Sequence, residues 1–102
     1  MTSGESNLKE LNFHLELSED DYRVKMRHAE EALWSGGKVK LQLKFRGREM
    51  PRLEEGIALV RRMILDLSGI GVADVEPRRI GKSINLMLSP LPPNKRVRKF
   101  SH

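Results

Sequence analysis

The sequence contains no cysteine, so disulfides, thiolate zinc sites and cysteine nucleophiles are excluded together. Aromatic residues are also scarce, at 5% of the chain. Apolar runs span only a few residues, whereas a helix that crosses a bilayer needs roughly 20. The stretch Met1–Glu10 is polar and lacks the apolar core of a signal peptide. We therefore expect a soluble, cytoplasmic protein that does not enter a membrane.

Positive charge is unevenly distributed along the 102 residues, a length typical of one domain. Residues 1–37 hold four Lys or Arg against eight Asp or Glu, while residues 38–102 hold fifteen against six. The net charge of +5 therefore comes from the later segment. A basic excess of this size favours a polyanionic partner such as nucleic acid.

The N-terminal part predicts a strand followed by a helix. Residues 11–15 alternate apolar and polar side chains, which is the period of a strand with one buried face. Ser18 precedes a run of acidic residues and predicts a helix N-cap, and Gly36-Gly37 predicts that the helix ends near Trp34. The apolar stripe of this helix consists of Tyr22, Met26, Ala29 and Leu33.

Residues 38–46 carry the clearest strand pattern of the chain. The apolar side chains that point to one face are Val39, Leu41, Leu43 and Phe45. The cationic side chains that point to the other face are Lys38, Lys40, Lys44 and Arg46. One face of this strand is therefore expected in the core, and the other forms a row of positive charge exposed to solvent.

A second helix is expected from Pro51 to Ser68-Gly69, with strands over 72–76 and 83–88 after it. Residues 77–81 read as a turn between these strands. The apolar stripe of the second helix consists of Leu53, Ile57, Val60, Ile64 and Leu67. Gly56 borders the stripe, where a missing side chain would let the helix approach the sheet closely.

The elements follow the order βαβαββ and predict the α+β class. We expect a two-layer sandwich in which two helices cover one face of a mixed four-stranded sheet. Residues 8–90 form the domain, residues 1–7 are expected to be a disordered N-terminus, and residues 91–102 a basic flexible tail.

No motif predicts catalysis, so we expect a protein that is not an enzyme and needs no cofactor. Gly81-Lys82-Ser83 matches only the end of a phosphate-binding P-loop, because Glu76 stands where that loop requires glycine. In the acidic doublets Asp20-Asp21, Glu30-Glu31 and Glu54-Glu55, the two side chains point about 100° apart around a helix. We therefore interpret them as solvent-exposed helix faces and not as paired catalytic carboxylates. The three histidines have no metal-ligand spacing, so no metal site is expected.

The predicted open face of the sheet lacks the aromatic pair with which RNA-recognition-motif sheets stack bases. Its outward residues are charged, polar or methionine. Such a surface favours contacts to phosphate and to the shape of a nucleic acid over base stacking.

Several segments together resemble the C-terminal domain of translation initiation factor 3. The run FRGREM over residues 45–50 is the most specific, and DYRVKMR over residues 21–27 precedes it at the expected distance. Further positions in register are Gly56, Glu76-Pro77, Gly81-Lys82 and the pair Leu88 and Pro90. The resemblance covers about residues 8–92.

The resemblance implies a βαβαββ domain that binds ribosomal RNA on the platform of the small subunit. We expect the chain to be a monomer. Such a domain blocks association of the large subunit and supports start-site selection, and it affects initiator tRNA and mRNA indirectly. The basic positions that the resemblance assigns to RNA binding are Lys25, Arg27, Arg46, Arg48, Arg62 and Lys82. The row on the open strand face adds Lys40 and Lys44 to this expected RNA-binding set.

Two positions depart from the family pattern, since His14 and Glu31 stand where members commonly carry arginine. A carboxylate at position 31 would repel phosphate and weaken part of the usual footprint. Complete factors carry an N-terminal domain and a lysine-rich linker, so the chain fits either a single-domain relative or part of a two-domain factor. Two alternatives stay open: an RNA- or ribosome-binding factor in subunit maturation or dormancy, and a protein-interaction module.

Overall fold

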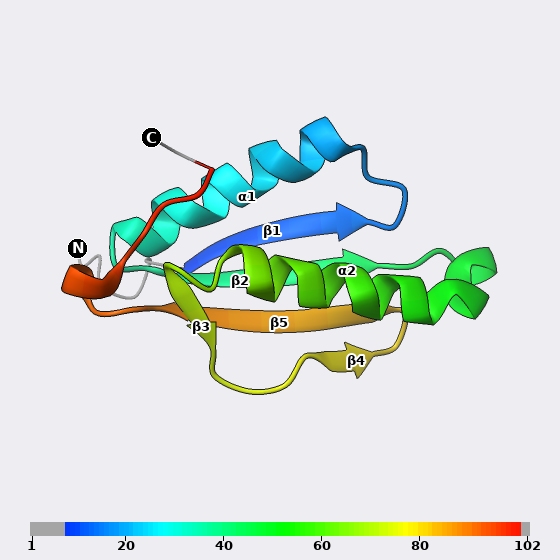
Figure 1. Cartoon of the computed structure of the whole chain (residues 1–102). Coiled ribbons are helices and arrows are strands. Elements are labelled where there is room, and N and C mark those ends of the chain that lie inside the picture. The colour runs from blue at the N-terminus through cyan, green and yellow to red at the C-terminus, as the bar shows by residue number, and fades with distance from the viewer. Residues whose placement is uncertain (1–7, 101–102) are drawn as a thin grey trace.

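The computed structural model describes residues 8–100, apart from the side chain of Met50, and shows an α+β sandwich (Figure 1). The residues expected to form a disordered N-terminus, 1–7, lie outside the described part. No helix within the described part is long and apolar enough to cross a membrane. The elements in chain order are β1 (Leu8–His14), α1 (Glu19–Trp34), β2 (Lys38–Lys44), η2 (Gly47–Arg52), α2 (Leu53–Asp66), β3 (Gly71–Ala73), β4 (Arg78–Ile80), β5 (Ser83–Pro90) and η3 (Pro93–Lys95).

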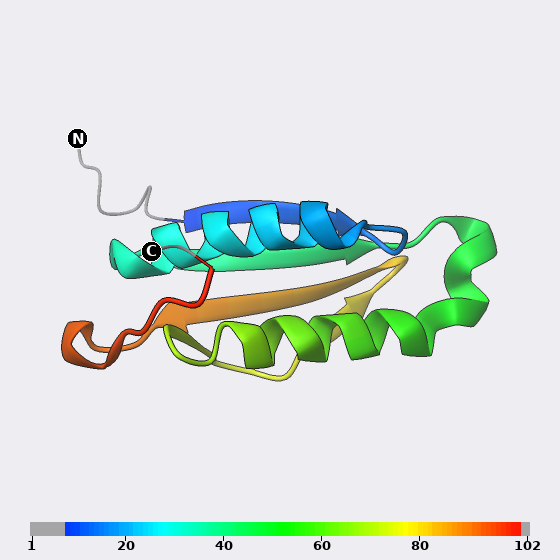
Figure 2. The ribbon, with the colours of Figure 1, turned by 45° about the horizontal axis from the view of Figure 1, so that its top comes forward.

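The sheet is mixed, which confirms the predicted fold class. β2 is central and pairs in parallel with β1 and antiparallel with β5. β3 and β4 pair antiparallel with successive halves of the other edge of β5. The views in Figures 1 and 2 place both helices on one side of the sheet. Side chains from that side form one core cluster together with the helices.

The predicted count of four strands was wrong, because the sheet has five. Residues 78–80, which read as part of a turn, form β4 and fold back on β5. The reversal occurs at Gly81, whose φ of +60° suits the first position of a two-residue hairpin turn. Such pairing depends on the partner strand, so the short sequence RRI gave no signal of its own.

Helix α1 begins and ends as the sequence predicts. The Ser18 side chain accepts a hydrogen bond from the Asp21 amide at 3.1 Å. At the other end Gly36 adopts a positive φ, and the Gly37 amide donates to the Ala32 carbonyl at 3.0 Å. This is a Schellman motif, in which glycine adopts the left-handed conformation at low cost. The predicted stripe of this helix is fully buried.

Helix α2 approaches the sheet closely at Gly56, as predicted. A methyl group added there would lie 2.2 Å from Cζ of Phe45 and 3.0 Å from Cδ2 of Leu43. The aromatic ring of Phe45, which is buried, therefore occupies the space that a side chain on α2 would need.

The apolar stripe of α2 is covered only in part, contrary to expectation. Val60 and Leu67 are buried, whereas Ile64 is half-buried and Ile57 is 38% exposed. The physical reason is the shape of the sheet on this side. β3 and β4 are three residues long, and residues 74–77 between them join no strand ladder, so that the sheet covers α2 incompletely.

Residues 91–100 lie across the ends of both helices, where the sequence led us to expect a flexible tail (Figure 2). Glu30 of α1 is 1% exposed, and its carboxylate accepts a hydrogen bond from the Phe100 amide at 2.8 Å. The Val97 amide donates to the Gly69 carbonyl at 2.7 Å, and Arg96 donates to the Trp34 carbonyl at the end of α1. We call residues 91–100 the C-terminal strap. The partners in these three contacts lie 28 to 70 positions away in sequence, so local composition could not predict this path.

Replacing Gly56 with alanine should destabilise the fold, although alanine favours a helix by about 1 kcal/mol over glycine. The added methyl group collides with the buried Phe45 ring. We expect the free energy of unfolding to fall by about 1–3 kcal/mol in chemical denaturation. Phe45→Leu in the same chain should recover part of that loss, because it frees space beside position 56.

The matched control is Gly47→Ala, whose methyl group would meet only Nζ of Lys82 at 3.6 Å and should leave stability nearly unchanged. Equal stability of Gly56→Ala and the parent would contradict the close approach of α2 to the sheet.

Candidate nucleic-acid interface

Four of the predicted RNA-binding residues come together at one end of the sheet. This end carries the β1–α1 connection, the turn from β2 into η2 and the β4–β5 hairpin (Figure 1). Its four cations are contributed by the end of β2, the following turn and the hairpin. We call this group the basic end, and it consists of Lys44, Arg46, Arg48 and Lys82.

The backbone holds the two loops of the basic end together. The Phe45 amide donates a hydrogen bond of 2.7 Å to the Lys82 carbonyl, which ties the end of β2 to the hairpin turn. Nζ of Lys82 reaches to the neighbourhood of Gly47 in the turn that follows β2. The Glu49 carboxylate accepts a hydrogen bond from the Arg46 amide at 2.7 Å and so closes that turn. The loops are thus fixed by contacts that leave the cationic groups outside.

All four side chains of the basic end are exposed, and within residues 8–100 none of them forms an ion pair. Exposed lysine and arginine side chains without carboxylate partners are available to bind anions. Four of them on adjacent loops raise the local positive potential, which attracts a polyanion such as nucleic acid.

The cationic row on β2 is less continuous than the sequence suggested. Lys38 and Lys44 are exposed, but Lys40 is half-buried and has Glu10 of β1 and Met87 of β5 as its neighbours in the sheet. Glu10 offsets part of the charge of Lys40. The exposed cations of this face therefore stand at the two ends of β2, and the one at its C-terminal end, Lys44, belongs to the basic end.

Amide side chains form the middle of the open face. Asn12, Gln42 and Asn85 are register neighbours on three adjacent strands. Asn85 donates from Nδ2 to Oγ of Ser83, while its Oδ1 is buried and has no hydrogen-bond partner among residues 8–100. This face offers hydrogen bonding and charge, and it holds no aromatic ring on which a base could stack.

The two predicted residues on α1 do not join the basic end. Lys25 is half-buried, with Nζ 5.5 Å from the centre of the Phe13 ring. Arg27 is exposed, and a separation of two positions turns it roughly 200° from Lys25 around the helix. These two cations therefore point to opposite sides of α1 and cannot contact one flat surface together.

Arg62 is engaged within the protein. It donates from Nη1 to Glu19 at 3.1 Å, lies 3.5 Å from the Asp66 carboxylate and covers the Tyr22 ring at 3.9 Å. The sequence assigned Arg62 to RNA binding through the family resemblance alone. Its spacing of four from Asp66 was a visible sign of an ion pair on α2, but the partner on α1 has no sequence signal.

Asp66 is the centre of this network, which we call the helix–strap network. Tyr22 Oη donates to the Asp66 carboxylate at 2.7 Å, and Nζ of Lys99 from the strap donates to it at 2.9 Å. Partial burial opposes ionisation of Asp66, but the hydrogen bonds from Tyr22 and Lys99 outweigh it and lower its pKa. The hydrogen bond from Arg62 likewise lowers the pKa of Glu19.

The two positions that depart from the family pattern are both exposed. His14 ends β1 and is the register neighbour of Lys44, so it borders the basic end. Glu31 lies on α1, away from that end. Within residues 8–100, no three His, Asp or Glu side chains gather in a way that could hold a metal ion.

The fold and the charged surface define a small α+β domain with four exposed cations at one end of its sheet. The chain belongs to the family described as "Translation initiation factor IF-3, C-terminal domain", whose profile matches residues 6–91. This result confirms the family that the residues 21–27 and 45–50 resemble.

Proteins named "Translation initiation factor IF-3" are similar to the chain. The one from Methylacidiphilum infernorum is 38% identical over 96% of this chain and 45% of its own length. Those from Tropheryma whipplei and Thermus thermophilus are 40% and 33% identical over 94% and 84% of this chain. The chain spans about half the length of the curated relatives it matches. These relatives are named as initiation factors and not as enzymes.

Removing the charge of Asp66 should change how stability depends on pH. Because its pKa is lower in the folded state than the usual value near 3.9, ionised Asp66 stabilises the fold above that value. This contribution is lost as the pH falls through the folded pKa. Asp66→Asn should therefore be less stable than the parent at neutral pH, by about 1 kcal/mol, and the difference should shrink at about pH 3.

Urea denaturation of both proteins at the two pH values measures this difference. The control is Glu31→Gln, an exposed acid on α1 outside the network, whose stability should follow that of the parent. If the difference in unfolding free energy between Asp66→Asn and the parent is the same at both pH values, the proposed role of the Asp66 charge is excluded.

Proposed function

We propose that this domain acts in translation initiation by binding the RNA of the small ribosomal subunit through its basic end. The observation that carries the proposal is the group of four exposed cations without ion-pair partners on adjacent loops. Membership of the initiation-factor family supports the ribosome as the source of the RNA.

Contacts to phosphate account best for the composition of this surface. Lysine and arginine side chains bind phosphate oxygens without reading base identity. The neighbouring sheet face carries amides instead of aromatic rings, which disfavours a base-stacking mode. The domain would therefore recognise the shape and charge of a folded RNA, and the amides of Asn12, Gln42 and Asn85 would supply hydrogen bonds beside the phosphate contacts.

Occupation of the subunit surface would be the means of action. A domain fixed on the face of the small subunit where the large subunit docks prevents association by excluded volume. This mode needs no catalytic group. Effects on initiator tRNA and on start-site selection would follow indirectly, from the position of the domain on the subunit.

The eight residues predicted from sequence have unequal roles in this proposal. Lys44, Arg46, Arg48 and Lys82 form the main contact, and Lys40 adds charge on the adjoining sheet face. Lys25 and Arg27 would contact RNA only where it wraps around α1. Arg62 would bind phosphate only if its ion pairs with Glu19 and Asp66 were broken. We therefore assign it a structural role in the helix–strap network and not a primary role in RNA binding.

Reversing two charges of the basic end should weaken binding and make it less dependent on salt. Each phosphate contact releases condensed counterions, so four contacts imply a log–log slope of affinity against salt of roughly −3 to −4. In the double variant Arg46→Glu and Arg48→Glu the slope should become shallower by about 2. Filter binding to purified small subunits over a salt series gives both quantities.

A double variant with Lys9→Glu and Arg23→Glu is the charge-matched control, because both residues are exposed and lie outside the basic end. The control should keep the slope of the parent. Equal slopes for the two double variants would mean that net charge, and not the basic end, controls binding.

Light scattering of mixed ribosomal subunits separates this function from the alternatives. The parent should both bind the small subunit and reduce association with the large one. Binding without reduced association would favour a factor in subunit maturation or dormancy. Absence of binding would leave a protein-interaction module.

A further inference from the structure

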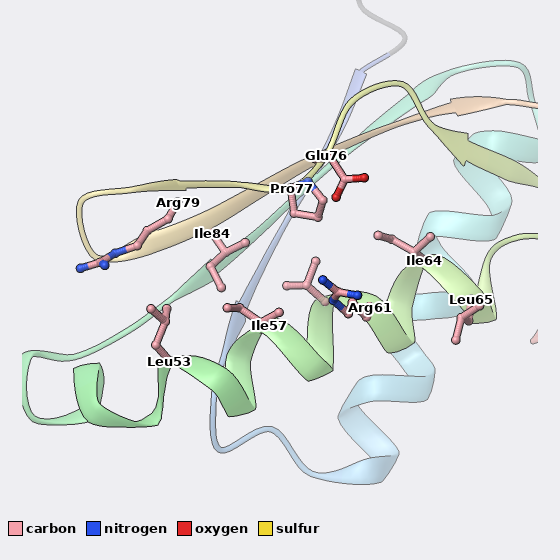
Figure 3. A pocket seen from close by; sticks show the side chains of 10 residues that line it. Leu53, Ile57, Arg61, Ile64, Leu65, Glu76, Pro77, Arg79 and Ile84 are labelled. Carbon is pink, nitrogen blue, oxygen red and sulfur yellow. The ribbon is translucent and has the colours of Figure 1, made fainter.

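A groove lies between α2 and the segment from the β3–β4 connection to β4, and one of its ends reaches the β4–β5 hairpin (Figure 3). Its volume is about 490 Å³, within the range of small-molecule sites. Leu53, Ile57 and Ile64 line the wall on α2, Pro77 lines the opposite wall, and Ile84 of β5 lies at the floor. The groove exists because β3 and β4 are too short to cover the apolar stripe of α2.

The apolar groups of this groove remain accessible in the folded domain. Ile57 is 38% exposed, and Leu65 at the end of the groove is 72% exposed. Helix α1 gives the internal comparison, because its own stripe is fully buried over β1 and β2. A contiguous apolar surface with polar residues at its rim is typical of a site that binds another protein.

The rim of the groove carries a net positive charge. Arg61 on α2 and Arg79 on β4 stand on opposite walls, and neither forms an ion pair within residues 8–100. Arg79 donates only to the Gly81 carbonyl, at 3.3 Å. Among the described residues that line the groove, Glu76 is the one acid. Two guanidinium groups against one carboxylate select an acidic partner.

We propose that this groove binds an acidic segment of a partner protein, which inserts large aliphatic side chains between α2 and β4 and places carboxylates beside Arg61 and Arg79. Leu53, Ile57 and Ile64 lie on one stripe of α2. A partner helix that lays its apolar face against this stripe would use the helix-in-groove mode of recognition. The groove adjoins the basic end at the β4–β5 hairpin but shares none of its four cations, and the proposed binding does not depend on RNA.

A nucleobase fits the groove less well than an aliphatic side chain. Base edges carry donors and acceptors that lose their hydrogen bonds to water on burial. The lining offers aliphatic groups in their place and contains no aromatic ring for stacking. The two arginines alone could hold a phosphate, but phosphate would leave the apolar walls uncovered.

Fluorescence anisotropy with defined probes tests the proposal. The probe is a fluorescein-labelled amphipathic peptide of about twelve residues, with leucines at helical spacing and glutamates between them. Comparison peptides replace the leucines with serine or the glutamates with lysine, and a labelled uridine oligonucleotide represents RNA. The full chain should bind the leucine–glutamate peptide saturably. Its affinity for each comparison peptide should be much lower.

Four variants assign the binding to the groove. Ile57→Ser and Arg61→Glu should each weaken peptide binding by about tenfold or more, while Glu76→Gln should strengthen it by removing a like charge. The matched apolar control is Val24→Ser on α1, where Val24 is 40% exposed and lies outside the groove. This control should bind the peptide as the parent does.

Three results would overturn the proposal. The first is that the acidic peptide shows no saturable binding. The second is that the Ile57→Ser and Arg61→Glu variants bind the peptide as tightly as the parent does. The third is that the oligonucleotide displaces the peptide and that Arg61→Glu loses oligonucleotide binding. The last result would make the groove a nucleic-acid site. Because the assay contains no ribosomal subunit, its failure leaves the proposed function of the basic end unaffected.

Discussion

The aromatic ring of Phe45 is the contact on which both the core and the charged end of this domain depend. Phe45 packs against the Cα of Gly56 and so fixes α2 on the sheet, while its amide donates to the Lys82 carbonyl. Its neighbours Lys44 and Arg46 project from the same turn into solvent. Burial of one side chain therefore positions cations contributed by β2, by the turn after it and by the β4–β5 hairpin.

The fold could be predicted wherever one segment carries its own pattern. The alternation of β2, the Ser18 cap and the glycine stop of α1 are local signals, and Gly56 was recognised as a close approach because a glycine beside an apolar stripe has few other uses. β4 and the C-terminal strap could not be predicted in this way. The strap is held by partners far along the chain, such as Glu30. β4 pairs with nearby residues of β5, but its sequence RRI carries no strand pattern of its own.

The candidate site was predictable in composition but not in arrangement. The basic residues around Gly47 and Lys82 stand out in the sequence, yet only the hairpin pairing brings them together. Arg62 shows the opposite case. Its charge matches the expected set, but it pairs with Glu19 on the other helix and with Asp66 one turn further along its own helix. A cation is available to a partner only if the fold leaves it without a carboxylate, and sequence patterns do not report this.

The absence of cysteine allows the most direct measurement, because one introduced cysteine provides one tether for an iron chelate that cleaves nearby RNA. Ile80→Cys would place the tether on an exposed residue beside the hairpin turn of the basic end, and Val97→Cys would place it on the exposed strap at the far end of the domain. If the basic end binds the small subunit, hydroxyl radicals from position 80 should cut its RNA at a few confined sites, and those from position 97 much less. Equal cleavage from both positions, or stronger cleavage from position 97, would contradict the account.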